Sequence, residues 1–137
     1  MASKVHGTAL ATALQAWVDG ATNLELRYLS GYTPDPDDAY LSDISASVAS
    51  GAPTPTLANV TVTYDSTNDR VRFDFDNPSD NNITTDCNGI AIIDDTGVAA
   101  TSEVLYTADI TQLQPTDGTL SLTIDANGLF ALGTNAA

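Results

Sequence analysis

The sequence predicts a mainly β fold, an antiparallel β-sandwich or jelly-roll-like domain with one N-terminal α-helix. Three observations support this class. Polar positions are filled mostly by Thr, Ser, Asn and Asp rather than by Lys, Glu and Arg, a mixture that favours strands and turns over long helices. Only residues 8–19 have clear helical periodicity. After them, short apolar runs alternate with turns that contain Gly and Asp, as in antiparallel sandwiches.

The length and the composition indicate a single domain. The chain has 137 residues, of which 42% are hydrophobic, enough to bury one core rather than remain disordered. We expect residues 1–137 to form one β domain, in which residues 1–22 are an N-terminal segment and helix and residues 23–137 are the sandwich.

The predicted helix covers residues 8–19. Thr8 is the expected N-cap and Gly20 the expected stop. The opposite face from its apolar side chains holds only Ala, Thr and Gln until Asp19, whereas a solvated helix usually carries charge there. We therefore expect the helix to be covered on more than one side, by its own domain or by a neighbouring subunit. The apolar face, at the spacing i, i+4, i+7, i+8, consists of Leu10, Leu14, Trp17 and Val18.

Residues 24–29 predict a strand, because apolar and polar side chains alternate up to Tyr28. Residues 31–44 begin as a loop, since Pro34 and Pro36 prevent a helix from starting among them.

A single helical turn is expected to end that segment. The pair Asp37 and Asp38 is the candidate cap for a turn that runs through Ile44. Residues 45–56, made of small residues and prolines, read as a loop too long to be only a turn.

The strongest hairpin pattern lies in residues 60–76. A strand at 60–64 and a second at 70–76 flank a polar turn at 65–69. Period-2 geometry places the apolar residues of each strand on one face and Asp74 and Asp76 on the opposite, solvated face. The apolar residues are Val60, Val62 and Tyr64 on the first strand and Val71, Phe73 and Phe75 on the second.

Three further strands are expected, at residues 89–93, 103–107 and 119–124. Turns rich in Asp, Gly and Asn separate or follow them, at residues 94–97, 115–118 and 125–128.

The charge balance excludes several classes of partner. The chain has four basic and 18 acidic residues, which give it a formal charge of −14. Nucleic acid and anionic membranes are therefore not expected partners, because the chain has no basic surface for phosphate. Abundant salt screens such a surface, so a marine or saline source is one interpretation and an ordinary acidic protein is the other.

The single cysteine, Cys87, excludes an intramolecular disulfide and a thiolate metal cluster. We expect it to be a small buried or half-buried residue at the start of a strand. The N-terminus lacks the apolar core of a signal peptide, and no run is apolar enough to cross a membrane. Synthesis in the cytoplasm, without a signal for general export, is the expectation.

The acidic stretch at residues 72–82 raises the question of calcium. Counted from Asp74, a helix-loop-helix calcium loop would need Gly at position 6 and Glu at position 12, where the chain has Ser79 and Thr85. A looser cage of Asp74, Asp76 and Asp80 is the alternative. We favour a solvated strand face that runs into an Asn-Pro turn, with no metal site.

Catalysis has little support in the sequence. His6 is the only histidine and Lys4 the only lysine, which argues against a hydrolytic triad, a zinc site or a phosphate loop. A glycosidase pair of carboxylates would arise by chance among so many acids. We predict no enzyme activity, no catalytic residue and no cofactor. The candidates for stacking on a sugar are Tyr28, Tyr32, Tyr40 and Tyr106, and a core or interface role is the favoured interpretation for most of them.

The order of segments resembles a family of small virion proteins of tailed bacteriophages. The matching pieces are an Ala- and Leu-rich helix ending near Gly20, the strand at 24–29, a Pro- and Asp-rich loop, the segment Asn88–Gly97 and the segment Asp117–Ile124. The similarity is one of layout and covers most of the chain.

Proteins of this family are head decoration or cement proteins, and in some cases tail or fibre components. The resemblance implies a structural protein, made in the host cytoplasm, on the outer surface of the virion head. It implies contact with the major capsid protein and with copies of itself, as a trimer at local threefold positions. The helix and residues 31–56 would supply the contacts, and a tail-fibre or adhesin-like module that binds a surface glycan is the alternative. The interface candidates are Leu10, Leu14, Trp17, Val18, Tyr32 and Tyr40.

Overall fold

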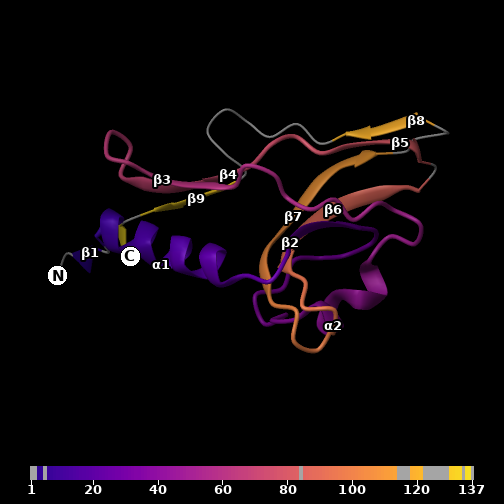
Figure 1. Ribbon diagram of the computed structural model, residues 1–137, viewed down its shortest axis with the longest axis horizontal. Helices are drawn as coiled ribbons and strands as arrows, with labels where there is room; N and C mark the ends of the chain where they lie inside the picture. The colour runs from indigo at the N-terminus through magenta and orange to yellow at the C-terminus, as the bar shows by residue number, and fades with distance from the viewer. Residues whose placement is uncertain are drawn as a thin grey trace. The chain divides into compact units, whose positions relative to one another are not determined.

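A computed structural model describes residues 3–4, 6–83, 85–113, 118–121, 130–133 and 135–136, with side chains for residues 6–79 and 85–110 (Figure 1). The chain groups into two compact units. Unit 1 is Met1–Gly20, Ala58–Asn77 and Thr123–Ala137; unit 2 is Ala21–Leu57 and Pro78–Leu122. The expectation that residues 1–137 form one domain stays a prediction.

Unit 1 is a helix that packs on a small antiparallel sheet. The sheet has the order β3-β4-β9, from Thr61–Asp65, Arg70–Asp74 and Phe130–Gly133. Helix α1, Gly7–Gly20, contacts β3 and β4 and runs beside them in Figure 1. Two short strands, β1 (Ser3–Lys4) and β10 (Asn135–Ala136), pair with each other. The predicted helix is confirmed, with two corrections at its ends: it begins at Gly7, so Thr8 lies inside the first turn and is not the N-cap, and Gly20 is its last residue.

The predicted hairpin is confirmed as β3 and β4. Asp65 organises its turn, because one carboxylate oxygen accepts hydrogen bonds from the backbone N–H groups of Thr67 and Asn68, at 3.1 and 3.3 Å. Alternation works as expected on β4, where Val71 and Phe73 are fully buried. Phe75 continues the same face, with its ring edge-on to that of Phe73 at 6.0 Å.

Unit 2 contains a three-stranded antiparallel sheet in the order β2-β6-β7, formed by Leu24–Leu29, Cys87–Asp94 and Val104–Leu113. Strands β5 (Ser79–Ile83) and β8 (Gly118–Ser121) form a second antiparallel pair. The helical turn α2 (Leu41–Ile44) and the 3-10 turn η1 (Ser45–Ser47) lie between β2 and unit 1's β3 in sequence. The fold class is confirmed: the chain is mainly β, its sheets are antiparallel, and one long α-helix lies at its N-terminus.

The segment after η1 is more than the predicted loop, because it runs along the outer edge of β2. Backbone hydrogen bonds join Ala49 N to Tyr28 O at 2.9 Å and Leu57 N to Leu24 O at 2.8 Å. A third joins Leu26 N to Pro55 O at 3.0 Å. These bonds satisfy edge groups that would otherwise be open to pairing with another chain.

The helical turn is capped differently from the prediction. It begins at Leu41, and the carboxylate of Asp43 accepts hydrogen bonds from the backbone N–H groups of Ala39 and Tyr40, at 3.1 and 2.9 Å. Asp37 and Asp38 lie before the turn, at a distance in sequence where their side chains do not cap it.

The later strands are predicted in part. The strands expected at 89–93 and 103–107 are present as longer strands, β6 and β7, and Cys87 is buried at the start of β6 as expected. Strand β8 covers the first part of the segment expected at 119–124. Residues 122–124, most of the 115–118 turn and the 125–128 turn lie outside the described residues. Strands β1, β5, β9 and β10 were not predicted.

Candidate functional site

A groove in unit 1 lies between helix α1 and strand β3. Its volume is about 400 Å³. Val62 and Tyr64, which share one face of β3, form one wall. The other wall is one side of the helix, and its residues are Thr8, Ala11, Thr12, Gln15, Ala16 and Asp19. Asp19 is the only charged residue in this lining, so the groove offers mainly small, uncharged side chains.

The solvent-facing side of α1 continues this uncharged surface. Ala9, Thr12, Ala13 and Ala16 are exposed, and no charged residue occurs between Gly7 and Asp19. The helix also has no acidic residue in its first turn and no basic residue in its last. The expectation that α1 lacks a charged face therefore holds on its exposed side.

The interface candidates of α1 point in part toward the helix's own unit. Leu14 is 7% exposed and belongs to the core, so its apolar surface is already covered. Leu10, Trp17 and Val18 are half-buried. Their assignment to an interface between chains stays a prediction. The exposed side of the helix consists mainly of alanines and threonines instead.

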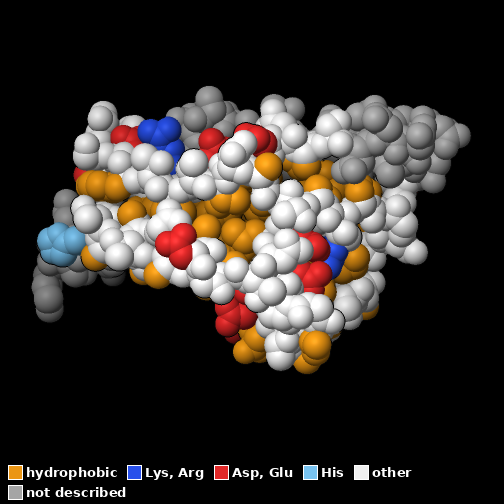
Figure 2. Space-filling view, viewed as in Figure 1, with side chains coloured by type: hydrophobic (Ala, Val, Ile, Leu, Met, Phe, Trp, Pro, Cys, Tyr) orange, Lys and Arg blue, Asp and Glu red, His pale blue; other side chains and the backbone are white. Residues whose placement is uncertain are grey.

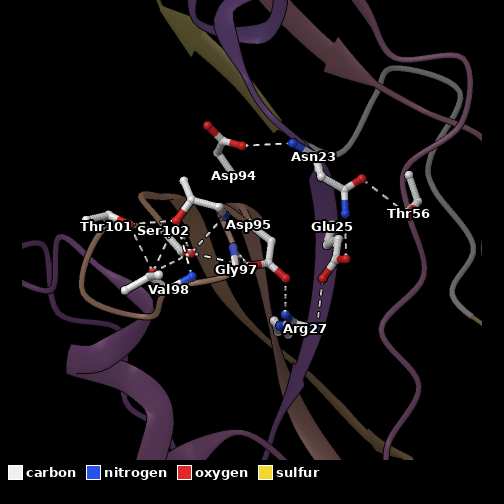
Figure 3. Close-up of polar contacts among 11 residues, drawn as sticks. Asn23, Glu25, Arg27, Thr56, Asp94, Asp95, Gly97, Val98, Thr101 and Ser102 are labelled. Atoms are coloured by element: carbon white, nitrogen blue, oxygen red, sulfur yellow. Dashed lines mark hydrogen bonds and ion pairs between the residues drawn. The ribbon is translucent and has the colours of Figure 1, made fainter.

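In unit 2, the loop that follows β6 is held by a buried serine (Figure 3). Ser102 is fully buried, and its Oγ accepts a hydrogen bond from Thr96 N at 3.0 Å. The same hydroxyl lies 2.9 Å from the carbonyl oxygen of Val98 and 3.3 Å from Asp95 Oδ1, and can donate to either. The Val98 carbonyl also accepts from Thr101 N at 3.0 Å. These hydrogen bonds connect the start of the loop, its central residue Val98 and its end at Ser102.

An ion network anchors this loop to β2. The guanidinium of Arg27 lies 2.9 Å from Glu25 and 2.9 Å from Asp95. Burial raises the pKa of Glu25, against the opposing effect of Arg27. The pKa of Asp95 is lowered, chiefly by the hydrogen bond from Gly97 N and further by the charge of Arg27. One arginine therefore forms ion pairs with two carboxylates, Glu25 on its own strand and Asp95 in the loop after β6.

The described arginines are all engaged with carboxylates. Besides Arg27, Arg70 and Arg72 both reach Asp65 Oδ2, at 3.5 and 2.9 Å. Figure 2 shows the same pattern on the face in view, where blue basic side chains lie against red acidic ones. Unit 2 holds 12 of the 18 acidic residues and one of the four basic residues, a net charge of −11. The remaining surface charge is thus almost entirely negative and lies mainly on unit 2.

The two tyrosine candidates lie in unit 2 in different environments. Tyr32 packs against the buried cluster of Leu29, Ile44, Ala91 and Ile93, and its hydroxyl donates to Asp38 at 2.7 Å. Tyr40 is 39% exposed and precedes α2. Of the other aromatic candidates, Tyr28 is buried and does not offer a ring to a sugar.

Among the large hydrophobic side chains that the structure describes, Val98 is the most exposed, at 58%, and it lies in the loop held by Ser102. Leu41 N donates to Ser102 O at 2.8 Å and Ser42 N to Ala99 O at 3.1 Å, so this loop is joined to α2. Val98 and the neighbouring Ala99 therefore form an exposed apolar tip on a loop of fixed geometry.

The solvated face expected for Asp74 and Asp76 is present in part, because Asp74 on the central strand β4 is half-buried. Asp76 is exposed, and its carboxylate accepts a hydrogen bond from Asn59 Nδ2. Asp74 Oδ1 accepts from Phe75 N at 2.9 Å. The side chain of Asp80 lies outside the described residues. Among the described side chains, no group of three His, Cys, Asp or Glu could hold a metal ion.

The potentially reactive side chains are not grouped. His6 is exposed just before α1, in unit 1, and Cys87 is buried in unit 2. Burial raises the pKa of the Cys87 thiol, and the charge of Asp86 adds to the effect, so the thiolate is disfavoured. Within the described residues, no helix has the length and apolar character to span a membrane.

Sequence reasoning missed both surfaces described above. The groove depends on Tyr64. The hairpin pattern predicts that Tyr64 lies on the apolar face of its strand, but it does not predict that α1 lies opposite that face. The Val98 tip follows the segment at residues 94–97, for which the sequence predicts only a turn. The sequence does contain one signal for this tip. Turns usually carry polar residues, but here a valine and two alanines follow Gly97.

No protein-family model matches the chain, and no curated protein or solved structure is significantly similar to it. The resemblance to phage virion proteins therefore stays a prediction, and the function is argued from the chain's own residues.

Proposed function

We propose that the protein is a structural virion protein that binds the outer surface of a bacteriophage capsid and stabilises it without catalysis. In this role it contacts the major capsid protein and associates with itself, preferably as a trimer. The observation that supports the proposal best is the uncharged exposed side of α1. The layout resemblance suggests the virion as the setting.

An uncharged exposed helix side is unusual on so acidic a chain. Asp and Glu make up 18 of 137 residues, yet the stretch from Thr8 to Val18 contains none. Charged residues are depleted where protein surfaces are covered by partners, because burying an unpaired charge is costly. The exposed alanines and threonines of α1 are thus suited to contact with another protein.

The charge of unit 2 suits a second part of the role. Its net charge of −11 would draw it toward basic patches on a shell and set its orientation on approach. Such charges affect the rate and the specificity of association more than its strength. Apolar contacts at α1 and at the Val98 tip would supply the affinity.

Binding alone can stabilise a shell. A protein that binds the assembled capsid and not its separated subunits shifts the equilibrium toward assembly by mass action. A specific interface needs about 1,200–2,000 Å² of total buried area, which several small surfaces on one chain can supply together.

The test uses particles assembled without the protein. We expect these particles to rupture at a lower temperature than complete ones, and purified protein to restore the difference. A variant with Ala9→Glu and Ala13→Glu keeps good helix formers but places charge on the exposed side of α1. We expect its occupancy on the particles to fall at least tenfold, whereas the control with Asp37→Ala and Asp38→Ala binds nearly as well as the original.

Two results would overturn the proposal. One is a stripped particle that is as heat-stable as the complete particle but no longer attaches to cells, which would favour the glycan-binding alternative. The other is equal occupancy by the Ala9→Glu, Ala13→Glu variant and the original protein. Light scattering of the free protein tests self-association, and a monomer both alone and on the particle would contradict the trimer.

A further inference from the structure

We infer that the groove between α1 and β3 receives an extended segment of a partner protein, which adds as a further strand to the free edge of β3. The inference rests on the proposed contact role of α1, but it does not require the partner to be a capsid protein.

Strand β3 has an available edge. In the described sheet the order is β3-β4-β9, so β3 pairs on one side with β4 and is the terminal strand. Alternate backbone N–H and C=O groups of an edge strand point away from its neighbour and can pair with an added strand. In unit 2 the outer edge of β2 is covered by the chain's own residues 47–57, but no described segment pairs with β3 in this way.

Features that protect edge strands are also missing from this part of β3. Residues 61–64 are Thr-Val-Thr-Tyr, without proline or charge, and the first charged residue is Asp65 at the turn. The carboxylate of Asp65 already forms ion pairs with Arg70 and Arg72. An uncharged, β-branched edge of this kind favours pairing with another strand.

Helix α1 supplies the second wall that such a strand needs. Side chains of an added strand alternate between the two faces of the sheet, and those on the helical side would enter the groove. There they would meet Ala11, Thr12 and Ala16, which are small enough to leave room for them. Backbone pairing would supply affinity and the groove would select alternate side chains, as in other strand-addition complexes.

The dimensions favour a segment over a globular surface. With 14 residues, α1 is about 21 Å long, and the five residues of β3 span about 17 Å. These lengths suit about five or six extended residues.

Charge favours a foreign segment over a second copy. Two copies would each bring a net charge of −14 to the contact. The groove itself carries one carboxylate, Asp19, whose Oδ1 accepts a hydrogen bond from Gln15 Nε2 at 2.8 Å. A partner segment with Lys or Arg at one end would complement Asp19, and apolar or small residues at alternate positions would fill the rest.

The test uses a defined pool of acetylated heptapeptides. Each has Thr at alternate positions, one of Ala, Val, Ile or Leu between them, and Lys at one end. The pool is passed over immobilised protein, and the retained members are identified by mass spectrometry. We expect a subset to be retained and to slow hydrogen exchange of the β3 amides. Replacing the central Thr of a retained peptide with Pro should abolish binding, because Pro donates no ladder hydrogen bond.

Matched variants locate the binding. Ala16→Phe fills the groove and should weaken binding at least tenfold. Gly20→Phe puts the same side chain at the end of the same helix, outside the groove lining, where a β-carbon meets nothing within 4 Å, and should leave peptide binding unchanged. Asp19→Asn keeps the oxygen that Gln15 contacts and should weaken Lys-ended peptides several-fold, with no effect on peptides that have Gln instead.

Retention of no peptide by the original protein, or equal retention by the Ala16→Phe variant, would overturn the inference. Self-association of the protein that Ala16→Phe abolishes would instead assign the groove to a second copy. Peptide binding with no effect of the protein on particle stability would support the groove while rejecting the capsid role.

Discussion

The ring of Tyr64 on β3 lies directly against the backbone of Gly7, where α1 begins. A β-carbon at position 7 would overlap three atoms of the ring, so only glycine fits there without a shift. This contact sets how closely the start of the helix approaches β3, and it therefore shapes one end of the groove.

Gly7→Ala should destabilise unit 1. The added methyl group forces either the ring or the helix to move, and overpacking of this kind costs about 1–3 kcal/mol. The measurement is urea unfolding followed by the fluorescence of Trp17, the only tryptophan. Gly20→Ala is the matched control, since a β-carbon there meets nothing within 4 Å and should be neutral or stabilising. Equal effects of the two changes would contradict the packing role of Gly7.

Ser102→Ala should loosen the loop that carries Val98. The buried hydroxyl accepts from Thr96 N, and its loss leaves a backbone group without its partner, at a cost of about 1–3 kcal/mol. We expect faster hydrogen exchange at residues 96–102 by mass spectrometry. Thr101→Ala also removes a hydroxyl from this loop, but an exposed one that water can replace, so its effect should be smaller.

Arg27→Met should destabilise unit 2, because it leaves Glu25 and Asp95 close together without a cation. Breaking a buried ion pair costs about 3–5 kcal/mol, and we expect somewhat less here since these side chains retain some exposure. Burial already raises the pKa of Glu25, and without Arg27 it should rise further. The loss of stability should thus be larger at pH 7 than at pH 4, where Glu25 gains a proton.

The control for this variant is the double change Arg27→Met with Glu25→Gln, measured by denaturant unfolding at both pH values. The double variant should recover part of the free energy of unfolding that Arg27→Met loses at pH 7. The loss relative to the original protein should then differ less between pH 7 and pH 4. A single Arg27→Met variant as stable as the original at pH 7 would show that the network contributes nothing to the fold.

Acid should weaken the hairpin through Asp65. Its pKa is lowered to about 2, first by the hydrogen bond from the Asn68 side chain and then by backbone N–H groups and Arg72. A carboxylate with a lowered pKa in the folded state adds stability above its unfolded pKa, and that contribution is lost as the pH falls through the folded pKa. The loss attributable to Asp65 should therefore fall between about pH 4 and pH 2.

Asp65→Asn should remove that part of the acid dependence in thermal unfolding followed by circular dichroism. Asp69→Asn, in the same turn, removes the same charge and serves as the matched control. If both variants have the same acid profile as the original protein, the stabilising role assigned to the Asp65 carboxylate is wrong.

The sequence alone determined the elements whose patterns are local. The helix at residues 7–20 and the β3–β4 hairpin follow from periods of 3.6 and 2, and both were predicted closely. The burial of Cys87 at the start of β6 was also predicted, on the different ground that no basic side chain lies beside it in the sequence to make it a reactive thiolate.

Only the tertiary structure decided which segments meet. The pairing of residues 47–57 with β2, and of β9 with β4, joins segments whose own patterns are weak, and such pairing depends on contacts between residues far apart in sequence. The burial of Glu25 and Arg27 depends likewise on Asp95, about 70 residues away. The groove exists because α1 lies beside a terminal strand, a relation set by packing. Periodicity specifies which face of an element is apolar. Which other element covers that face depends on the packing free energy of the whole chain.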